Sequence, residues 1–263
     1  KSSLINALLD DSRSIVSNIP GTTRDAVDLD FTWKKKPYTL IDTAGMRQRR
    51  RLDDPLEVAM TGRSAHAINR SDICVLVIDA DRGVLMQDKK VGSLISQHYR
   101  PCVIAINKWD LAEEQGDAGR AAQKSFSEGI REELFFLHYA PIVFVSAKTR
   151  HKLSTLMQQV DKTWQRCQTR FPTGQLNRML QEVMTAVPPP RVKGKRFKLL
   201  YAAQQLDEKR GERQVPALIL FCNDGRTLTP AYKRYLEDKV RNEYELGGCP
   251  LKFVLRGRNA NMS

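Results

Sequence analysis

The chain has 263 residues, a length that accommodates one large domain or two ordinary ones. Charged residues make up 28% of it, and no apolar run approaches the ~20 residues that span a bilayer, so we expect no membrane-spanning helix. The five cysteines are dispersed without a CxxC pair, and the first residues lack the apolar stretch of a secretory signal. These features argue against a disulfide framework or a zinc site and predict a cytoplasmic protein.

The charge is strongly basic, with 43 Lys and Arg against 30 Asp and Glu and a net charge of +13. The excess is concentrated near the end, because residues 171–263 hold 17 basic and 9 acidic side chains. A balance of this kind favours a polyanionic partner, usually nucleic acid. The alternative is that basic faces serve only solubility.

The first part of the chain alternates short apolar runs, rich in Val and Ile, with longer amphipathic stretches. Such runs are typical of parallel strands that helices cover on both faces. In chain order we expect helix 4–9, strand 38–42, helix 56–67, strand 73–79, helix 87–97, strand 102–107, helix 118–134, strand 142–146 and helix 152–168. This order predicts a doubly wound α/β domain with a mainly parallel sheet.

The pattern changes at residues 168–174, where QTRFPTG is polar and contains Pro and Gly. This stretch indicates a linker, although Thr173 could equally cap the next helix. After it we expect helix 176–186, strands 197–204 and 217–222, helix 230–244 and strand 251–255, the order of a small α+β domain. The predicted limits are a first domain at 1–169, a linker at 170–174, a second domain at 175–258 and a tail at 259–263.

The chain opens with KSSLINAL. In a phosphate-binding loop GxxxxGK[ST], the lysine reaches the β and γ phosphates and the hydroxyl binds Mg²⁺. Lys1 and Ser2 would be those residues, at the start of the first helix. The glycines and the strand that precede such a lysine are not in the sequence.

Two further motifs fit the same chemistry. In PGTTRD, residues 20–25, a loop threonine is the residue type that supplies a second hydroxyl to Mg²⁺; the alternative is an ordinary turn. DTAG, residues 42–45, follows an apolar run. Asp42 would bind Mg²⁺ through water, and Gly45 would let its amide approach the γ-phosphate, where a side chain would clash.

The most specific motif is NKWD, residues 107–110, at the end of an apolar strand. Guanine presents two adjacent donors, N1–H and the 2-amino group, which a carboxylate accepts together and which adenine lacks. Asp110 would supply this selectivity, Asn107 would brace the loop and contact N7, and Lys108 would lie along the base. SAK, residues 146–148, also ends a strand, and the Ala147 amide would donate to guanine O6.

These residues resemble a known family. KSSLINAL, PGTTRD, DTAGMR, NKWD and FVSAK are similar to the motifs of GTPases of the Era and EngA branch. LNRMLQEV, PPPRVKGKRFKLLYAAQ and YKRYLEDKVRNEYELGGCPLKFVLR resemble the end of the Der/EngA family of bacterial tandem GTPases. The resemblance implies a P-loop GTPase domain, whose first strand and glycine loop are not in the sequence, followed by a small α+β KH-like domain.

The resemblance also implies residue roles, with GTP or GDP and Mg²⁺ as cofactors. The nucleotide would contact Lys1, Ser2, Ser3, Asp42, Gly45, Asn107, Lys108, Asp110, Ser146, Ala147 and Lys148. Mg²⁺ would be held by Ser2, Asp42 and Thr23, with Thr22 as the alternative to Thr23. Catalysis would involve Lys1, Thr23 and Gly45.

One departure concerns Met46, which stands where many GTPases carry a glutamine that positions the attacking water. Relatives with this departure use K⁺ held by loop carbonyls, here those of Ser17 and Ile19. The arginines at 47, 49, 50 and 51 form either a mobile switch or a solvated run.

The implied function is GTP hydrolysis coupled to assembly of the large ribosomal subunit, with that subunit and its rRNA as partners, and the protein a monomer. A first GTPase domain, outside this sequence, would be an intramolecular partner. The expected RNA surface is basic: Arg191, Lys193, Lys195, Arg196 and Lys198. The KH-like part has no GxxG loop, so ordinary KH-style recognition is not expected.

Two other hypotheses stay open at this point. One is an RNA- and ribosome-docking module without catalysis, because the glycine loop that holds the phosphates is not in the sequence. The other is a different GTPase of the same branch, such as a tRNA-modification protein, against which the C-terminal third argues.

Overall fold

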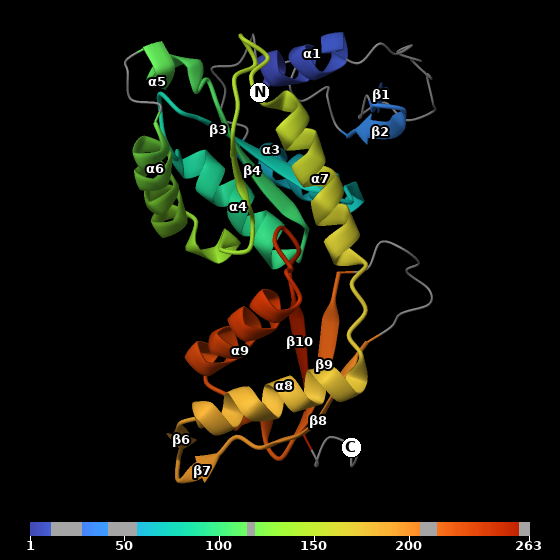
Figure 1. Cartoon of the computed structure of the whole chain (residues 1–263), viewed down its shortest axis with the longest axis vertical. Coiled ribbons are helices and arrows are strands. Elements are labelled where there is room, and N and C mark those ends of the chain that lie inside the picture. The colour runs from blue at the N-terminus through green and yellow to red at the C-terminus, as the bar shows by residue number, and fades with distance from the viewer. Residues whose placement is uncertain (12–27, 42–56, 115–118, 206–214, 258–263) are drawn as a thin grey trace. The chain divides into compact units, whose positions relative to one another are not determined.

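The structure is a computed structural model that describes residues 1–11, 28–41, 57–114, 119–205 and 215–257. The chain forms two compact units, Lys1–Lys162 and Thr163–Ser263, whose boundary lies within helix α7 (Leu153–Cys167) (Figure 1). The domain limits expected from the sequence remain a prediction. Within the expected linker, Phe171 is buried and helix α8 begins at Thr173.

The first unit is an α/β domain with a parallel sheet, as predicted. Its strands are β1 (Leu29–Trp33), β2 (Lys36–Leu40), β3 (Cys74–Asp79), β4 (Cys102–Asn107) and β5 (Ile142–Phe144). Its other helices are α1 (Ser2–Asp11), α3 (Glu57–Arg70), α4 (Met86–Gln97), α5 (Asp110–Glu114) and α6 (Arg120–Glu133). Strands β3, β4 and β5 pair in parallel with β4 in the centre.

Strand β4 is buried along its whole length, because helices cover both faces of the sheet. Ile104 and Ile106 face a core that contains Ile95 of α4 and Ile130 of α6. Val103 and Ala105 face a second core, which contains side chains of α1 and α7. This double coverage explains why the strand has an uninterrupted apolar sequence.

The strand expected at 38–42 differs from the prediction. It is strand β2, which begins at Lys36 and pairs antiparallel with β1, a strand that the sequence analysis did not anticipate. The physical reason is the tight connection at Lys34 and Lys35, whose φ values of 48° and 69° form the kind of two-residue turn that joins antiparallel neighbours. The hairpin is held to α7, where Asp161 accepts hydrogen bonds from Lys36 Nζ and from the Tyr38 hydroxyl.

The second unit is a small α+β domain with the predicted α-β-β-α-β order. Helices α8 (Thr173–Ala186) and α9 (Pro230–Glu243) accompany strands β8 (Leu199–Gln204), β9 (Ala217–Cys222) and β10 (Lys252–Gly257). The sheet order is β10-β9-β8, with β9 parallel to β10 and antiparallel to β8. A short hairpin, β6 (Arg191–Val192) and β7 (Lys195–Arg196), precedes the sheet and was not predicted.

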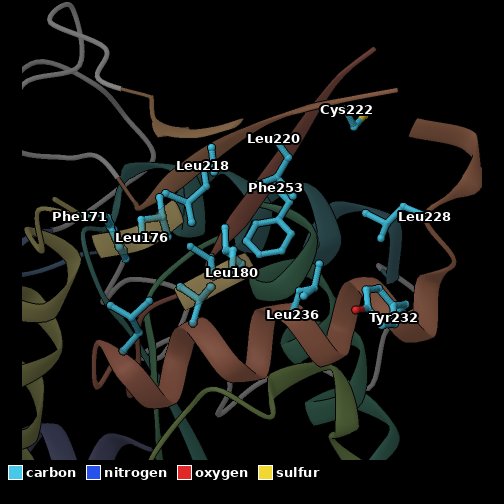
Figure 2. Close-up of a cluster of buried hydrophobic side chains, with 14 of the residues drawn as sticks. Phe171, Leu176, Leu180, Leu218, Leu220, Cys222, Leu228, Tyr232, Leu236 and Phe253 are labelled. Atoms are coloured by element: carbon cyan, nitrogen blue, oxygen red, sulfur yellow. The ribbon is translucent and has the colours of Figure 1, made fainter. Parts of the chain in front are cut away.

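The core of the second unit lies on one face of its sheet. Figure 2 shows Leu218 and Leu220 of β9 and Phe253 of β10 pointing toward Leu180 of α8 and Leu236 of α9. Residues that alternate with these along the strands face away from the helices. The sheet is therefore packed on one side by helices, unlike the sheet of the first unit.

All five cysteines are buried and unpaired. Burial raises the pKa of the Cys102 and Cys249 thiols well above its ordinary value, so both stay protonated at neutral pH. Among the described residues, the helices are all too short or too polar to cross a membrane.

Gly248 gives a test of packing in the second unit. Its φ is +85°, and a Cβ there would lie 2.3 Å from Oγ1 of the fully buried Thr163. We expect Gly248→Ala to lower the free energy of unfolding by about 2 kcal/mol, because of backbone strain and overlap. Chemical denaturation of the whole chain measures this change.

Gly129 is the matched control for Gly248. It lies on the exposed face of helix α6, and a Cβ there meets no atom within 4 Å. Gly129→Ala is expected to stabilise the protein by roughly 0.5–1 kcal/mol, because alanine is the better helix former. Equal effects of the two substitutions would contradict the packing described for Gly248.

Candidate functional site

The carboxyl ends of β3, β4 and β5 bring the predicted base-binding residues to one edge of the sheet. Asn107 is the last residue of β4, and Lys108 and Asp110 follow it. Ser146, Ala147 and Lys148 follow β5, which pairs with β4 in parallel. Ligands of open α/β sheets bind at this edge.

Asn107 ties the two loops together. The residue is 4% exposed, and its Oδ1 accepts a hydrogen bond from the Ala147 N–H at 3.0 Å. The Trp109 N–H also donates to the Val145 carbonyl at 3.1 Å. The bracing role expected for Asn107 stays a prediction, and the Ala147 amide, expected from the SAK motif to donate to guanine O6, donates to Asn107 in this structure.

Asp110 is a buried carboxylate with one acceptor oxygen that lacks a hydrogen bond in the described part of the chain. The residue is 5% exposed, and among the described residues its Oδ1 has no hydrogen-bond partner. Its Oδ2 lies 3.9 Å from Nζ of Lys148, which is largely exposed. A buried carboxylate oxygen without a donor is costly, so this geometry favours a ligand that presents hydrogen-bond donors to it.

The neighbouring Trp109 anchors the loop from below. The residue is 3% exposed, and its ring lies against those of Phe144 and Phe126, with ring centroids 4.4 and 5.6 Å away. This packing holds the backbone between Asn107 and Asp110. Lys108 takes up a left-handed conformation, with φ of +68°, and its side chain is half exposed.

Ser146 holds a turn in this structure. It is almost fully buried, its Oγ accepts a hydrogen bond from the Thr149 N–H at 3.1 Å, and its own N–H donates to the His151 carbonyl. These bonds shape the loop that presents Ala147 and Lys148. The contacts support a positioning role for Ser146 in the candidate site.

The predicted phosphate residues lie at the start of helix α1. Ser2 and Ser3 are exposed in the first turn of α1, whereas Leu4 and Leu8 of the same helix are buried in the core. Lys1 Nζ lies 3.6 Å from Oδ1 of Asp88. Of the other predicted residues, Ser17, Ile19, Thr22, Thr23, Asp42, Gly45 and Met46, and the arginines at 47, 49, 50 and 51, lie outside the described residues.

Two carboxylates at this edge were missed by the sequence analysis. Asp79 is the last residue of β3, stands in register with Asn107, and its Oδ2 lies 2.5 Å from Lys108 Nζ. Asp88, in the first turn of α4, is buried, accepts a hydrogen bond from the Leu85 N–H and pairs with Lys1. A carboxylate directly after a buried apolar strand was the available signal for Asp79.

The predicted RNA-binding residues lie on and beside the β6–β7 hairpin. Its turn residues Lys193 and Gly194 both have positive φ, and Arg191 stands opposite Arg196. Arg191, Lys193, Lys195, Arg196 and Lys198 are all exposed, and no ion pair is found for them within the described part of the chain. Like charges directly opposite each other destabilise a strand pair, so an anion bound here would relieve the repulsion.

Asn223 fixes the base of this hairpin and was also missed. Its Oδ1 accepts a hydrogen bond from the Lys198 N–H, and its Nδ2 donates to the Arg196 carbonyl, each at 2.9 Å. Phe197, between those two residues, is buried in the core. The basic side chains therefore project from an anchored backbone.

Each of the two parts of the chain matches a known protein family. Residues 1–108 match the family described as 50S ribosome-binding GTPase. Residues 170–256 match the family described as KH-domain-like of EngA bacterial GTPase enzymes, C-terminal. Together these matches agree with the α/β and α+β units of the structure.

Curated relatives extend the similarity over the whole chain. GTPase Der of Akkermansia muciniphila is 40% identical over 263 residues, covering 99% of this chain and 56% of the relative. GTPase Der of Pelotomaculum thermopropionicum is 41% identical over 256 residues, covering 97% of this chain and 56% of the relative. The chain thus spans little more than half the length of these relatives.

Solved structures are more distant. Translation elongation factor SelB from Methanococcus maripaludis has a TM-score of 0.46 and 19% identity, covering 66% of this chain and 32% of that one. The chain is therefore similar over nearly its whole length to curated GTPases named Der, and its C-terminal part matches the KH-domain-like family of EngA GTPases.

Proposed function

We propose that this chain binds guanine nucleotides and hydrolyses GTP to GDP and phosphate, as a switch in assembly of the large ribosomal subunit. The observation that carries the proposal is the buried Asp110 carboxylate, whose Oδ1 has no hydrogen-bond partner in the described part of the chain. Guanine offers the two adjacent donors that this group requires. The names of the matching families and relatives support the same activity.

The base site divides the work among several residues. Asp110 accepts N1–H and the 2-amino group, and Lys148 lies near the same carboxylate. Lys108 covers the base, with Asp79 as its counter-ion. Asn107 holds the Ala147 loop in place, so that the backbone of this loop lies at the edge of the base.

The phosphate end would use Lys1 for the β and γ phosphates and Ser2, Thr23 and Asp42 for Mg²⁺. All three metal ligands offer oxygen, which is the ligand that Mg²⁺ prefers. Mg²⁺ would neutralise charge that develops on the phosphates during attack by water. Gly45 would present its amide to the γ-phosphate, and the carbonyls of Ser17 and Ile19 would hold K⁺.

The ribosomal role draws on the second unit. The β6–β7 hairpin carries basic side chains on an anchored backbone, suited to rRNA phosphates. The match to a family named for ribosome binding supports the large subunit as partner. We place this action in the cytoplasm, with a monomeric protein, and with a further GTPase domain as the region of the relatives that this chain does not span.

The first prediction from the proposed function concerns base selectivity. Asp110→Asn replaces an acceptor-only group by an amide, which matches xanthine, where a carbonyl replaces the 2-amino group. We expect GDP affinity to fall by roughly 10²-fold or more, and XDP binding to be gained. Competition titrations with GDP, XDP and ADP measure this change, and unaltered GDP selectivity would refute the assigned base contact.

The second prediction concerns Asp79. Asp79→Asn removes the charge that faces Lys108 while keeping an acceptor for the Asp81 N–H. Because the pair is partly exposed, we expect GDP to dissociate up to about fivefold faster. Stopped-flow release of a fluorescent GDP analogue measures the rate.

Asp81→Asn is the control for Asp79, because it removes the same charge from an exposed residue two positions along the chain. A cycle with Lys108→Met isolates the coupling between Asp79 and Lys108. If both aspartate variants accelerate release equally, or if the coupling is zero, Asp79 does not position Lys108.

The third prediction concerns the hairpin. Changing Lys193, Lys195 and Arg196 to glutamine removes three phosphate-neutralising charges. For single-stranded rRNA segments, the log–log slope of affinity against salt should fall in magnitude by about 2. The control changes Lys233, Arg234 and Lys239 of helix α9 to glutamine, and an equal loss there would place the contacts outside the hairpin.

A further inference from the structure

The sheet of the second unit has a face that points away from α8 and α9. Along β9 the buried Leu218, Leu220 and Cys222 alternate with the half-buried Ala217, Ile219 and Phe221. Along β10, Phe253 and Leu255 pack on the core, while Val254 and Arg256 alternate with them. Because successive side chains of a strand point to opposite faces, the second set lies on the face opposite the helices.

Two aromatic rings and an arginine form one row across this outer face. Tyr201 of β8 is the register partner of Phe221 of β9, which is the register partner of Arg256 of β10. The Tyr201 and Phe221 ring centroids are 6.1 Å apart, with 41° between the ring planes. Tyr201 is 46% exposed and Arg256 is exposed, so the row (Tyr201, Phe221 and Arg256) is open to a ligand.

A bulge widens the apolar part of this surface. The β8–β9 register shifts between Leu199 and Tyr201, which inserts Leu200 as an extra residue. Leu199 packs against the core, whereas Leu200 is 40% exposed beside Tyr201. The strand thus keeps two successive large side chains exposed, Leu200 and Tyr201.

The row lies at the end of the sheet nearest the basic hairpin. Cys222 pairs with Leu199, and the next residue, Asn223, bonds the backbone of Lys198 and Arg196. The exposed side chains of Lys198 and Arg196 therefore project close to the start of β8, next to the row. Aromatic rings bordered by positive charge are suited to single-stranded nucleic acid, because bases stack on the rings and phosphates contact the positive charges.

The edge of β8 disfavours a peptide as the occupant. A peptide that extends a sheet needs free backbone groups along an edge strand. At Ala202 both groups are occupied, because the Asn177 side chain accepts a hydrogen bond from its N–H and donates to its carbonyl. Gln204, at the end of the same strand, uses its side chain to bond Phe171 and Thr169.

We propose that this outer face binds single-stranded RNA, with bases stacked on Tyr201 and Phe221 and a phosphate at Arg256. The proposal deepens the proposed rRNA role and rests on it for the class of ligand; the nucleotide site takes no part. The site differs from the basic hairpin because it supplies stacking, which distinguishes single strands from duplexes.

The test measures binding of a short fluorescein-labelled oligouridylate to the whole chain by anisotropy, at several salt concentrations. Tyr201→Ala should weaken binding by about tenfold, with an unchanged salt slope, because stacking releases no counterion. Tyr201→Phe keeps a ring and should stay within about twofold of the parent. Arg256→Gln should reduce the magnitude of the salt slope by about 0.7.

Matched controls come from exposed residues away from the row. Phe135→Ala removes a ring that is 59% exposed in the first unit, and Arg178→Gln removes an exposed arginine from helix α8. Neither should change RNA affinity. Thermal unfolding and GDP titration of every variant establish that both units are intact.

The outcomes separate this proposal from the one on which it rests. If the parent binds RNA and the hairpin variant weakens it while Tyr201→Ala does not, the hairpin stands and the outer face is overturned as an RNA site. If the parent binds GDP but no RNA, both RNA proposals fail and the nucleotide site survives. If Tyr201→Ala instead abolishes self-association in sedimentation velocity without affecting RNA, the face is a protein interface and the proposal is wrong.

Discussion

The burial of β4 on both faces is the constraint on which the first unit depends. Its residues face one core or the other in alternation, so neither face tolerates a polar side chain before Asn107. Polarity returns where the strand reaches the edge of the sheet, and the candidate base site begins there. The rigid strand thus positions the loop that carries the candidate base site, an arrangement common in α/β proteins.

Hydrogen bonds then turn two separate loops into one site. Asn107 and the Ala147 amide join the loop after β4 to the loop after β5, and Trp109 fills the space below them. Asp110, in the loop that this bond joins, is buried with one acceptor that has no hydrogen-bond partner among the described residues. Leaving a buried carboxylate oxygen without a hydrogen bond costs free energy. A ligand with two donors would remove this cost, which is a physical basis for selectivity.

The second unit differs from the first because helices cover only one face of its sheet. Its core uses one face of β8, β9 and β10, and the other face retains aromatic and basic residues. Its polar side chains secure the parts that project: Asn223 anchors the hairpin, and Asn177 closes the edge of β8. The domain therefore offers two surfaces of different chemistry, one of charge alone and one of rings with charge.

The sequence by itself determined the order of the main helices and of strands β3–β5 and β8–β10, both fold classes and the residues of the NKWD motif, because apolar runs and strand-end motifs are local patterns. The bounds of β4 and β9 agree residue for residue with the prediction. Only the tertiary structure decided the antiparallel pairing of β2, the Asp79–Lys108 pair, the partner of the Ala147 amide and the row across β8, β9 and β10. Most of these features join residues that are far apart in the chain, and the pairing of β2 depends on a turn at Lys34 and Lys35 without the usual glycine. Local patterns do not encode such contacts, because they arise only when separate strands come together in one register.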